Sequence, residues 1–182
     1  MKSKFLGTIA LVPVLLLGLA CTNQRSQDGT YKTDNQSYKD AVKQALQQSE
    51  LQDVTVDEDR DKNTITLGGK VHSEDARQQA TDVAKAAAGN RVIANEISVQ
   101  PVGAESASKD IASDQDTAIE KNYKATLIAK GLDKKHIRFD AKNGVITLKG
   151  SVTNPSERRQ AEQLAAATPN VRQVVNELDV NR

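Results

Sequence analysis

The chain is poor in the residues from which many functional sites are built. Its 182 residues include one Cys, two His, two Phe, three Tyr and no Trp. One Cys cannot form a disulfide framework within the chain, and two isolated His residues do not make a zinc site. No nucleophile with a supporting catalytic motif occurs, and the few aromatic residues give nucleic acid no stacking platform. We therefore expect a protein that is not an enzyme, holds no cofactor or metal, and has no nucleic-acid partner.

A charge excess and long apolar runs are lacking as well. The 25 basic and 24 acidic residues leave a formal net charge of +1. The apolar stretch from Phe5 to Ala20 has 16 residues. This is short of the ~20 residues that span a bilayer as a helix, and Pro13 interrupts it. Two lysines precede the stretch and a small residue ends it, a pattern typical of a secretory signal peptide over residues 1–20.

The only cysteine, Cys21, directly follows this stretch, after the residues LLGLA. The segment resembles the lipobox of bacterial lipoproteins, in which the cysteine is lipidated and becomes the new N-terminus. We expect residues 21–34 to be a lipidated polar tether, because two or three acyl chains hold a protein stably on a membrane. Thr22 stands where the inner-membrane retention signal has Asp, so the resemblance implies export and an outer-membrane anchor facing the periplasm. A cleaved signal peptide with an incidental cysteine and an uncleaved anchor are the alternatives.

The chain contains two copies of one sequence module. Shifted by 81 positions, the segment 64–99 aligns with 145–180 without a gap, and 14 of the 36 aligned positions are identical. Self-similarity of this kind indicates repeated domains. We place the two copies at 35–101 and 116–182, with an Ala/Ser/Asp-rich linker over 102–115.

Each copy predicts the same order of elements. Apolar residues at helical spacing, beginning at Tyr38 and Ile119, are followed by a short alternating strand, a turn and a second strand, ITLGGKV or ITLKGSV. A second helix follows, with Ser73 or Asn154 as its N-cap, and an alternating strand ends the copy. The order α-β-β-α-β predicts an α+β fold of two tandem domains, each a three-stranded mixed sheet packed on two helices. Because a domain of this size has a small hydrophobic core, we expect the two copies to pack against each other or against a partner.

Several polar and small residues recur at matching positions. Gly69 and Gly150 stand in mid-strand, where glycine weakens a sheet, so they predict a bulge or the close approach of a helix. Asn95 and Asn176 face the core by alternation, and we expect their side chains to hydrogen-bond nearby backbone. Two arginines near the helix starts are expected on the surface: Arg77 and Arg158.

The text from Val145 to Leu178, VITLKGSVTNPSERRQAEQLAAATPNVRQVVNEL, resembles the BON (bacterial OsmY and nodulation) domain. A glycine-containing strand, an amphipathic helix and a terminal V-x-N-E-hydrophobic strand recur in that family, and the first copy matches well from Ile65 onward. The resemblance implies a non-enzymatic cell-envelope protein that binds phospholipid and supports envelope integrity or stress tolerance. With the lipobox, the chain is similar to envelope lipoproteins with two BON domains, and also to osmotically inducible periplasmic proteins. The lipoprotein resemblance implies lipid contact by the second domain, especially its first helix.

The neutral total hides opposite charges on the two copies. Residues 35–101 carry 8 basic and 11 acidic residues, net −3, whereas residues 116–182 carry 12 and 8, net +4. The change is concentrated in the first helix of the second copy and the loop after it. Cations beside an apolar residue suit an anionic phospholipid surface, at about 1 kcal/mol per Lys near the headgroups. We therefore predict a phospholipid-binding patch made of Lys121, Lys124, Ile128, Lys130, Lys134, Lys135 and Arg138.

Alternatives stay open for the patch, its alignment and the function. The patch can be a solvated lysine face with an incidental Ile. Without a gap, Asp53 and Val54 correspond to Lys134 and Lys135, whereas the other alignment shifts the first strand by two residues. The protein can also be a periplasmic adaptor or chaperone-like module, whose open sheet face or edge strand binds envelope proteins.

Overall fold

The computed structural model describes residues 37–132 and 136–181. Gln36–Arg182 form one compact unit that holds both copies of the repeat. The expected signal peptide, Cys21 and the tether over 21–34 lie outside the described residues, as do Lys134 and Lys135. None of the described helices is both long and apolar enough to cross a membrane.

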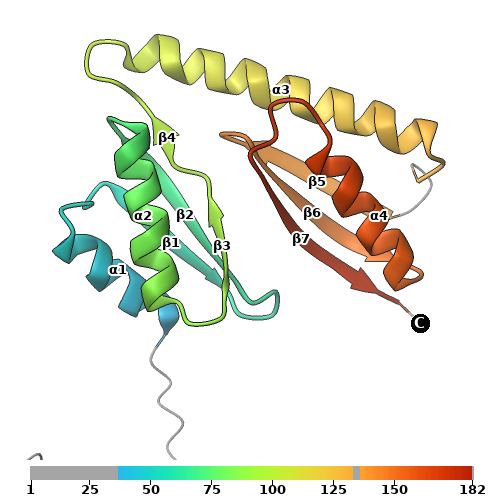
Figure 1. Ribbon diagram of the computed structural model, residues 1–182, viewed down its shortest axis with the longest axis horizontal. Helices are drawn as coiled ribbons and strands as arrows, with labels where there is room; N and C mark the ends of the chain where they lie inside the picture. The colour runs from blue at the N-terminus through green and yellow to red at the C-terminus, as the bar shows by residue number, and fades with distance from the viewer. Residues whose placement is uncertain (1–36, 133–135, 182) are drawn as a thin grey trace, which may run out of the picture. The chain divides into compact units, whose positions relative to one another are not determined.

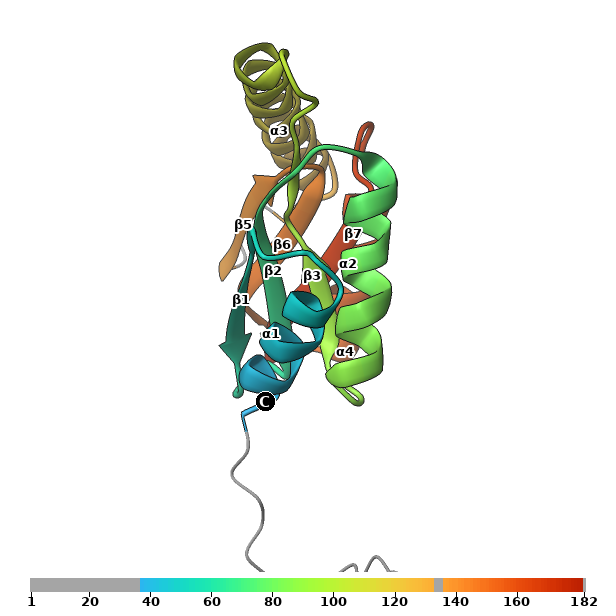
Figure 2. The same cartoon turned by 90° about the vertical axis from the view of Figure 1, so that its left-hand side faces the viewer.

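The first repeat is a small mixed sheet with two helices on one face (Figure 1). Its elements are α1 (Tyr38–Gln48), β1 (Val54–Asp59), β2 (Thr64–Val71), α2 (Glu74–Ala87), β3 (Val92–Asn95) and β4 (Ser98–Val99). Strand β1 pairs antiparallel with β2, which pairs in parallel with β3 and β4. Figure 2 shows α1 and α2 side by side in front of this sheet, and the two helices contact each other.

The second repeat has the same architecture, with β5 antiparallel and β7 parallel to the central strand β6. Its elements are α3 (Glu105–Ala129), β5 (His136–Lys142), β6 (Val145–Val152), α4 (Pro155–Ala166) and β7 (Gln173–Val180). The predicted α+β fold of two repeated units is confirmed. One detail differs in the first repeat, where the last strand is interrupted at 96–97. Because β3 and β4 keep one register along β2 across that gap, together they correspond to β7.

Most of the segment expected as a linker is helical. Helix α3 begins at Glu105, so residues 105–115 are continuous with the first helix of the second repeat. This stretch contains neither Pro nor Gly, the two residues that most disfavour a helix interior. Its few apolar residues left no helical periodicity in the sequence, which is why composition alone indicated a linker.

Local signals determine the helix starts and the second hairpin. The Ser73 hydroxyl and the Asn154 side chain each accept a hydrogen bond from the backbone N–H three residues on, at 3.2 and 2.9 Å. Both predicted N-caps are therefore confirmed. Asn143 and Gly144, between β5 and β6, have φ values of 48° and 79°. Two positive values are the geometry of a type I′ turn, which matches the twist of paired strands.

Each repeat has its own hydrophobic core between its sheet and its helices. The largest fully buried apolar side chains of the first core are Val42, Leu46, Ile65, Leu67 and Ile97. Those of the second core are Ile119, Tyr123, Ile146 and Leu148. All of these residues lie within the compact unit, so a chain shortened to residues 22–182 keeps both cores whole.

The two repeats also contact each other, as the thin cores led us to expect. Ala94 of β3 packs on Val145 and Val175 in a small apolar cluster. The side-chain amide of Gln173 hydrogen-bonds two backbone groups of β3 and so extends its hydrogen bonding. Three ion pairs among the described residues join the repeats as well: Lys62 with Asp179 at 2.7 Å, Lys142 with Glu96 at 3.1 Å and Arg172 with Glu74 at 3.7 Å.

Gly69 and Gly150 lie on the central strand of each repeat, in close contact with the first strand. Their φ values are +90° and +103°, a region that favours glycine. A Cβ atom at either position would overlap the backbone carbonyl oxygen opposite, that of Asp53 or His136. The close approach is therefore present, but the adjacent strand makes it and not a helix.

This shared contact shows how the two first strands correspond. Val54 pairs with Gly69 in the first repeat, and Ile137 pairs with Gly150 in the second. Val54 therefore corresponds to Ile137, so the alignment shifted by two residues is the right one. The second repeat has two more residues before this strand and two fewer in the following hairpin loop. The ungapped alignment is wrong for two pairs: Asp53 with Lys134 and Val54 with Lys135.

Asn95 and Asn176 join the second helix of each repeat to its last strand. In each, the side-chain amide donates to the carbonyl of an arginine, Arg77 or Arg158, and the side-chain oxygen accepts from the N–H two residues on. The predicted hydrogen bonds to backbone are confirmed. Both arginines are half-buried, so the expected surface positions are wrong. The Arg158 guanidinium donates to the carbonyls of Asn176 and Leu178, at 2.8 and 3.0 Å.

Glu58 joins the start of α1 to the first sheet. Its carboxylate accepts a 2.6 Å hydrogen bond from the Ser37 hydroxyl and lies 3.1 Å from the Arg91 guanidinium. The Ser37 hydrogen bond, helped by the charges of Arg91 and Arg60, holds the pKa of Glu58 below its ordinary value although burial acts in the opposite direction. The Arg91 guanidinium also lies over the ring of Tyr38, 4.7 Å from its centroid.

Substituting alanine for Gly150 tests the close approach of the strands. We expect Gly150→Ala to lose far more stability than Gly131→Ala, measured by urea unfolding followed by circular dichroism. Gly131 is the matched control because it has a φ of +69° but no atom within 4 Å of a built Cβ. Its substitution should cost only the left-handed backbone, about 1–2 kcal/mol. Equal losses for the two variants would show that the strand contact does not matter.

The Glu58 network predicts a pH dependence with a definite sign. Because the folded-state pKa is lowered, Glu58 stabilises the protein above its unfolded-state pKa, and the contribution disappears as the pH falls through the folded-state value. Glu58→Gln should lower the thermal midpoint by several degrees at pH 7, since ~1 kcal/mol corresponds to about 4–8 °C in a domain of this size. In acid the variant and the wild type should converge. Asp57→Asn, at an exposed neighbour, is the control, and a pH-independent difference for Glu58→Gln would contradict the assignment.

Candidate functional site

The C-terminal half of α3 has a buried stripe that fixes its rotation. The stripe consists of Ile119, Tyr123 and Leu127. The Tyr123 hydroxyl donates to the Ala161 carbonyl at 3.1 Å, and its ring meets Phe139 edge-on with the centroids 4.9 Å apart. Burial raises the pKa of Tyr123, so the hydroxyl stays protonated and keeps donating. These contacts determine which side of α3 faces away from the core.

Three of the predicted site residues meet at a groove between α3 and β5, here called the α3–β5 groove. Lys124 and Ile128 of α3 and Arg138 of β5 are among the residues that line it, and the groove has a volume of about 630 Å³. Ile128 is 54% exposed although it is a large apolar residue. The other described residues of the lining are apolar: Leu127, Leu132, Ile137 and Phe139.

The cations of the groove are not used in ion pairs within the described part of the chain. Over residues 37–132 and 136–181, neither Lys124 nor Arg138 has a side-chain hydrogen-bond or ion-pair partner. Lys121 and Lys130 are exposed but do not line the groove. Lys134 and Lys135, the remaining predicted members, lie outside the described residues. The structure thus brings together three of the seven predicted residues.

The first repeat carries different side chains at the same places. The strand register and the ungapped helix alignment give these corresponding pairs: Lys43 with Lys124, Gln47 with Ile128 and Thr55 with Arg138. Below them, Val54 and Val56 are buried, whereas their counterparts Ile137 and Phe139 are only half-buried. The second repeat therefore exposes more apolar surface and one more cation at this place.

The apolar lining of the groove is the part of the site that the sequence patterns missed. Ile137 and Phe139 alternate along β5, and such alternation by itself predicts buried core residues. Partial exposure of such residues depends on how closely α3 covers β5, which no local pattern reports.

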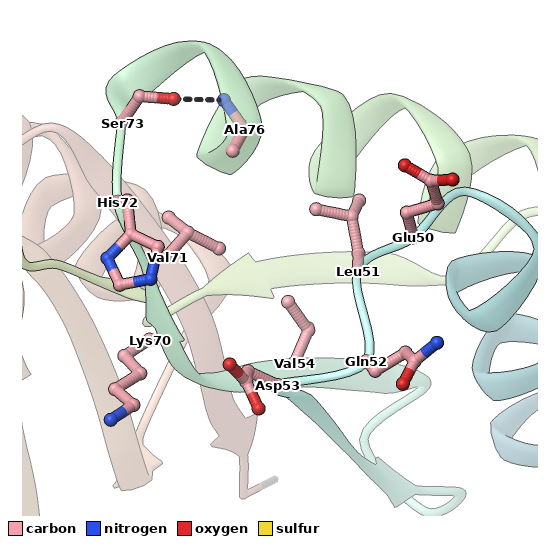
Figure 3. A pocket seen from close by; sticks show the side chains of 10 residues that line it. All are labelled: Glu50, Leu51, Gln52, Asp53, Val54, Lys70, Val71, His72, Ser73 and Ala76. Atoms are coloured by element: carbon pink, nitrogen blue, oxygen red, sulfur yellow. Dashed lines mark hydrogen bonds between the residues drawn. The ribbon is translucent and has the colours of Figure 1, made fainter.

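A second pocket, of about 360 Å³, opens in the first repeat beside the start of α2 (Figure 3). Figure 3 shows Val54 near its middle, with Lys70 and His72 on one side and Glu50 on the other. The charges are of both signs, and the Nδ1 atom of His72 lies 3.0 Å from the Gln100 carbonyl oxygen. We assign no ligand to this pocket. Among the described residues, no group of three His, Cys, Asp or Glu side chains is placed to hold a metal ion.

Comparison with known proteins identifies the repeated module. The family model of the BON domain matches the chain twice, at residues 34–101 and 115–182. The chain belongs to the BON domain family. The α3–β5 groove is therefore a feature of the second of two BON domains, and the resemblance expected from the sequence is confirmed.

One relative is the osmotically-inducible protein Y of Escherichia coli (strain K12). It is 30% identical over 119 residues, which make up 65% of this chain and 58% of that protein. The BON chain thus spans less than two thirds of the length of this relative.

Two solved structures of CdsD, a structural protein of the type III secretion system of Chlamydia trachomatis, are also similar. One holds its C-terminal domain, with 14% identity and a TM-score of 0.33 over 79% of this chain and 67% of that chain. The other has 11% identity and a TM-score of 0.34 over 78% of this chain and 91% of that chain. Scores of this size have no bearing on function.

Proposed function

We propose that this chain is a non-enzymatic cell-envelope lipoprotein that docks on anionic phospholipid surfaces through its second BON domain. The BON family is typically non-enzymatic, and the name of the Escherichia coli relative associates that protein with osmotic induction. We further propose that docking supports envelope integrity or stress tolerance, with the chain held at the outer membrane facing the periplasm.

The observation that carries the proposal is the meeting of Lys124, Ile128 and Arg138 at one exposed groove. Two cations that have no partners among the described residues lie at the groove together with an exposed apolar residue. Basic residues near an anionic bilayer gain about 1 kcal/mol each, and burial of an exposed apolar side chain adds to that attraction. The first BON domain has Gln47 and Thr55 at two of the three places, so the same fold supplies its own comparison.

Charge reversal of the lysines tests the docking surface. We expect the 22–182 fragment to float with anionic vesicles and not with zwitterionic ones, and to release as ionic strength rises. A variant with four lysines of the patch replaced by Glu should bind at least tenfold more weakly. It carries Lys121→Glu, Lys124→Glu, Lys134→Glu and Lys135→Glu.

A matched control separates this patch from net charge. Four other lysines are exposed, are in no ion pair among the described residues, and lie outside the patch. The control carries Lys43→Glu, Lys70→Glu, Lys85→Glu and Lys109→Glu. It has the same net charge and should keep most of the binding. Unchanged flotation of the patch variant, or an equal loss in the control, would refute the assigned surface.

The anchor at Cys21 has its own test. Cells fed radiolabelled palmitate should incorporate label into the full chain, and Cys21→Ser should abolish that incorporation and move the protein to the soluble fraction. Because this measurement does not involve the second BON domain, it stands apart from the vesicle experiment. Export without label in the wild type would indicate a signal peptide with an incidental cysteine.

A further inference from the structure

We infer that Arg77 and Arg172 hold a small oxyanion of the phosphate class in a pocket between the two BON domains, here called the arginine pocket. Its volume is about 220 Å³, and it is lined by residues of both repeats and of the linker stretch of α3. The described lining contains these two arginines, three uncharged polar side chains and four apolar ones, but no Asp or Glu. It shares no described residue with the α3–β5 groove, so the inference does not depend on membrane docking.

Arg77 differs from its counterpart in the second repeat in how its guanidinium is used. The Arg158 guanidinium donates to two carbonyls of the last strand, at 2.8 and 3.0 Å. In the first repeat that strand is interrupted at 96–97, and in the described part of the chain the Arg77 guanidinium donates to no backbone carbonyl. Its one partner there is the Glu74 carboxylate, at 3.0 Å. Because a guanidinium has five N–H donors, most of those of Arg77 are left for a ligand.

Two guanidiniums share one carboxylate at this place. The oxygens of Glu74 lie 3.0 Å from Arg77 and 3.7 Å from Arg172, so the three groups together keep a charge of +1. The Arg77 side chain is only 13% exposed. Its burial, together with the nearby charge of Arg172, holds the pKa of Arg77 below its ordinary value. Arginine remains charged in proteins, so an oxyanion between the two guanidiniums would relieve this repulsion.

The rest of the arginine pocket adds neutral donors and limits the size of the ligand. Ser108 and Gln115 line it, and their side chains have no hydrogen-bond partner among the described residues. The Arg172 N–H donates to the Gly144 carbonyl at 2.8 Å, which fixes the base of that side chain. The volume is below the roughly 300–1,000 Å³ of drug-sized sites, and a guanidinium matches two oxygens of a phosphate at once. These features favour phosphate or a small phosphate monoester.

A bound oxyanion would join the two domains, because Arg77 belongs to the first and Arg172 to the second. A ligand that binds only the folded arrangement stabilises it in proportion to the logarithm of the ligand concentration. The arginine pocket therefore links the cohesion of the two BON domains to the concentration of a small anion.

Inorganic phosphate is the probe, titrated into the 22–182 protein with chloride adjusted to constant ionic strength. We expect saturable shifts of the amide NMR signals around the pocket, including those of Ile97 and Gln115. At a concentration 100 times the dissociation constant, phosphate should raise the thermal midpoint by about 5–10 °C. Because phosphate also stabilises proteins in general by exclusion from their surface, variants have to accompany this measurement.

Arg172→Gln removes one guanidinium from the pocket, and since Arg172 is half exposed the cores stay intact. This variant should bind phosphate at least tenfold more weakly and lose most of the gain in thermal midpoint. Arg159→Gln is the matched control, because it removes an exposed arginine of the same repeat, and it should change neither measurement. Arg77→Lys keeps the charge but loses the planar fork, so it should weaken binding at least threefold.

The outcomes separate this inference from the proposed function. Equal phosphate affinity in Arg172→Gln and Arg159→Gln, or a midpoint gain that Arg172→Gln retains, would overturn the site and leave membrane docking standing. Vesicles that contain phosphatidic acid test a lipid headgroup as the source of the phosphate, and Arg172→Gln should leave their binding unchanged. Loss of that binding in Arg172→Gln, without phosphate shifts in solution, would overturn the small-anion site and assign the arginines to the membrane surface.

Discussion

The contact between a central-strand glycine and the carbonyl opposite is the constraint on which both domains depend. Gly69 and Gly150 accept a left-handed backbone and bring the first strand so close that no side chain fits between them. Since strand side chains alternate, this register decides which residues of the first strand face the helices. In the second domain it turns Ile137 and Phe139, which line the groove, toward α3. The groove therefore depends on a glycine that does not touch it.

One scaffold carries two surface chemistries. Both domains keep the same glycine contact, capped second helix and asparagine link between helix and last strand, and these features lie on the inside of the fold or at helix ends. The outward face of the first helix, the loop after it and the edge strand are free of those constraints. The largest differences occur there, as in the exchange of Gln47 for Ile128 and of Thr55 for Arg138. The +1 total therefore says little about function, because net −3 and net +4 domains contribute to it.

Local chemistry made much of this fold predictable. The positive φ values of Asn143 and Gly144, the caps at Ser73 and Asn154, and the strand alternation are each set by neighbouring residues, so the sequence was sufficient for them. Features set by tertiary contacts were not. The Arg158 guanidinium bonds to carbonyls of β7, twenty residues along the chain, and nothing near it in sequence indicates such a partner. Of the candidate site, helical spacing found Lys124 and Ile128, but the apolar lining depends on how α3 lies over β5.

The groove lies among positions that are not needed for the core of the fold. A domain of this size has a small core and is only marginally stable. If fully buried residues contacted a ligand instead of the core, the domain would lose most of that stability. The residues between the first helix and the edge strand are different. Ile137 and Phe139 are half-buried in the protein alone, and a ligand that covers them would complete their burial. A ligand bound there stabilises the fold instead of competing with it. Selection for binding can therefore change the residues between the first helix and the edge strand in one domain, while the other domain keeps Val54 and Val56 buried. We expect paired BON domains to differ most at this place.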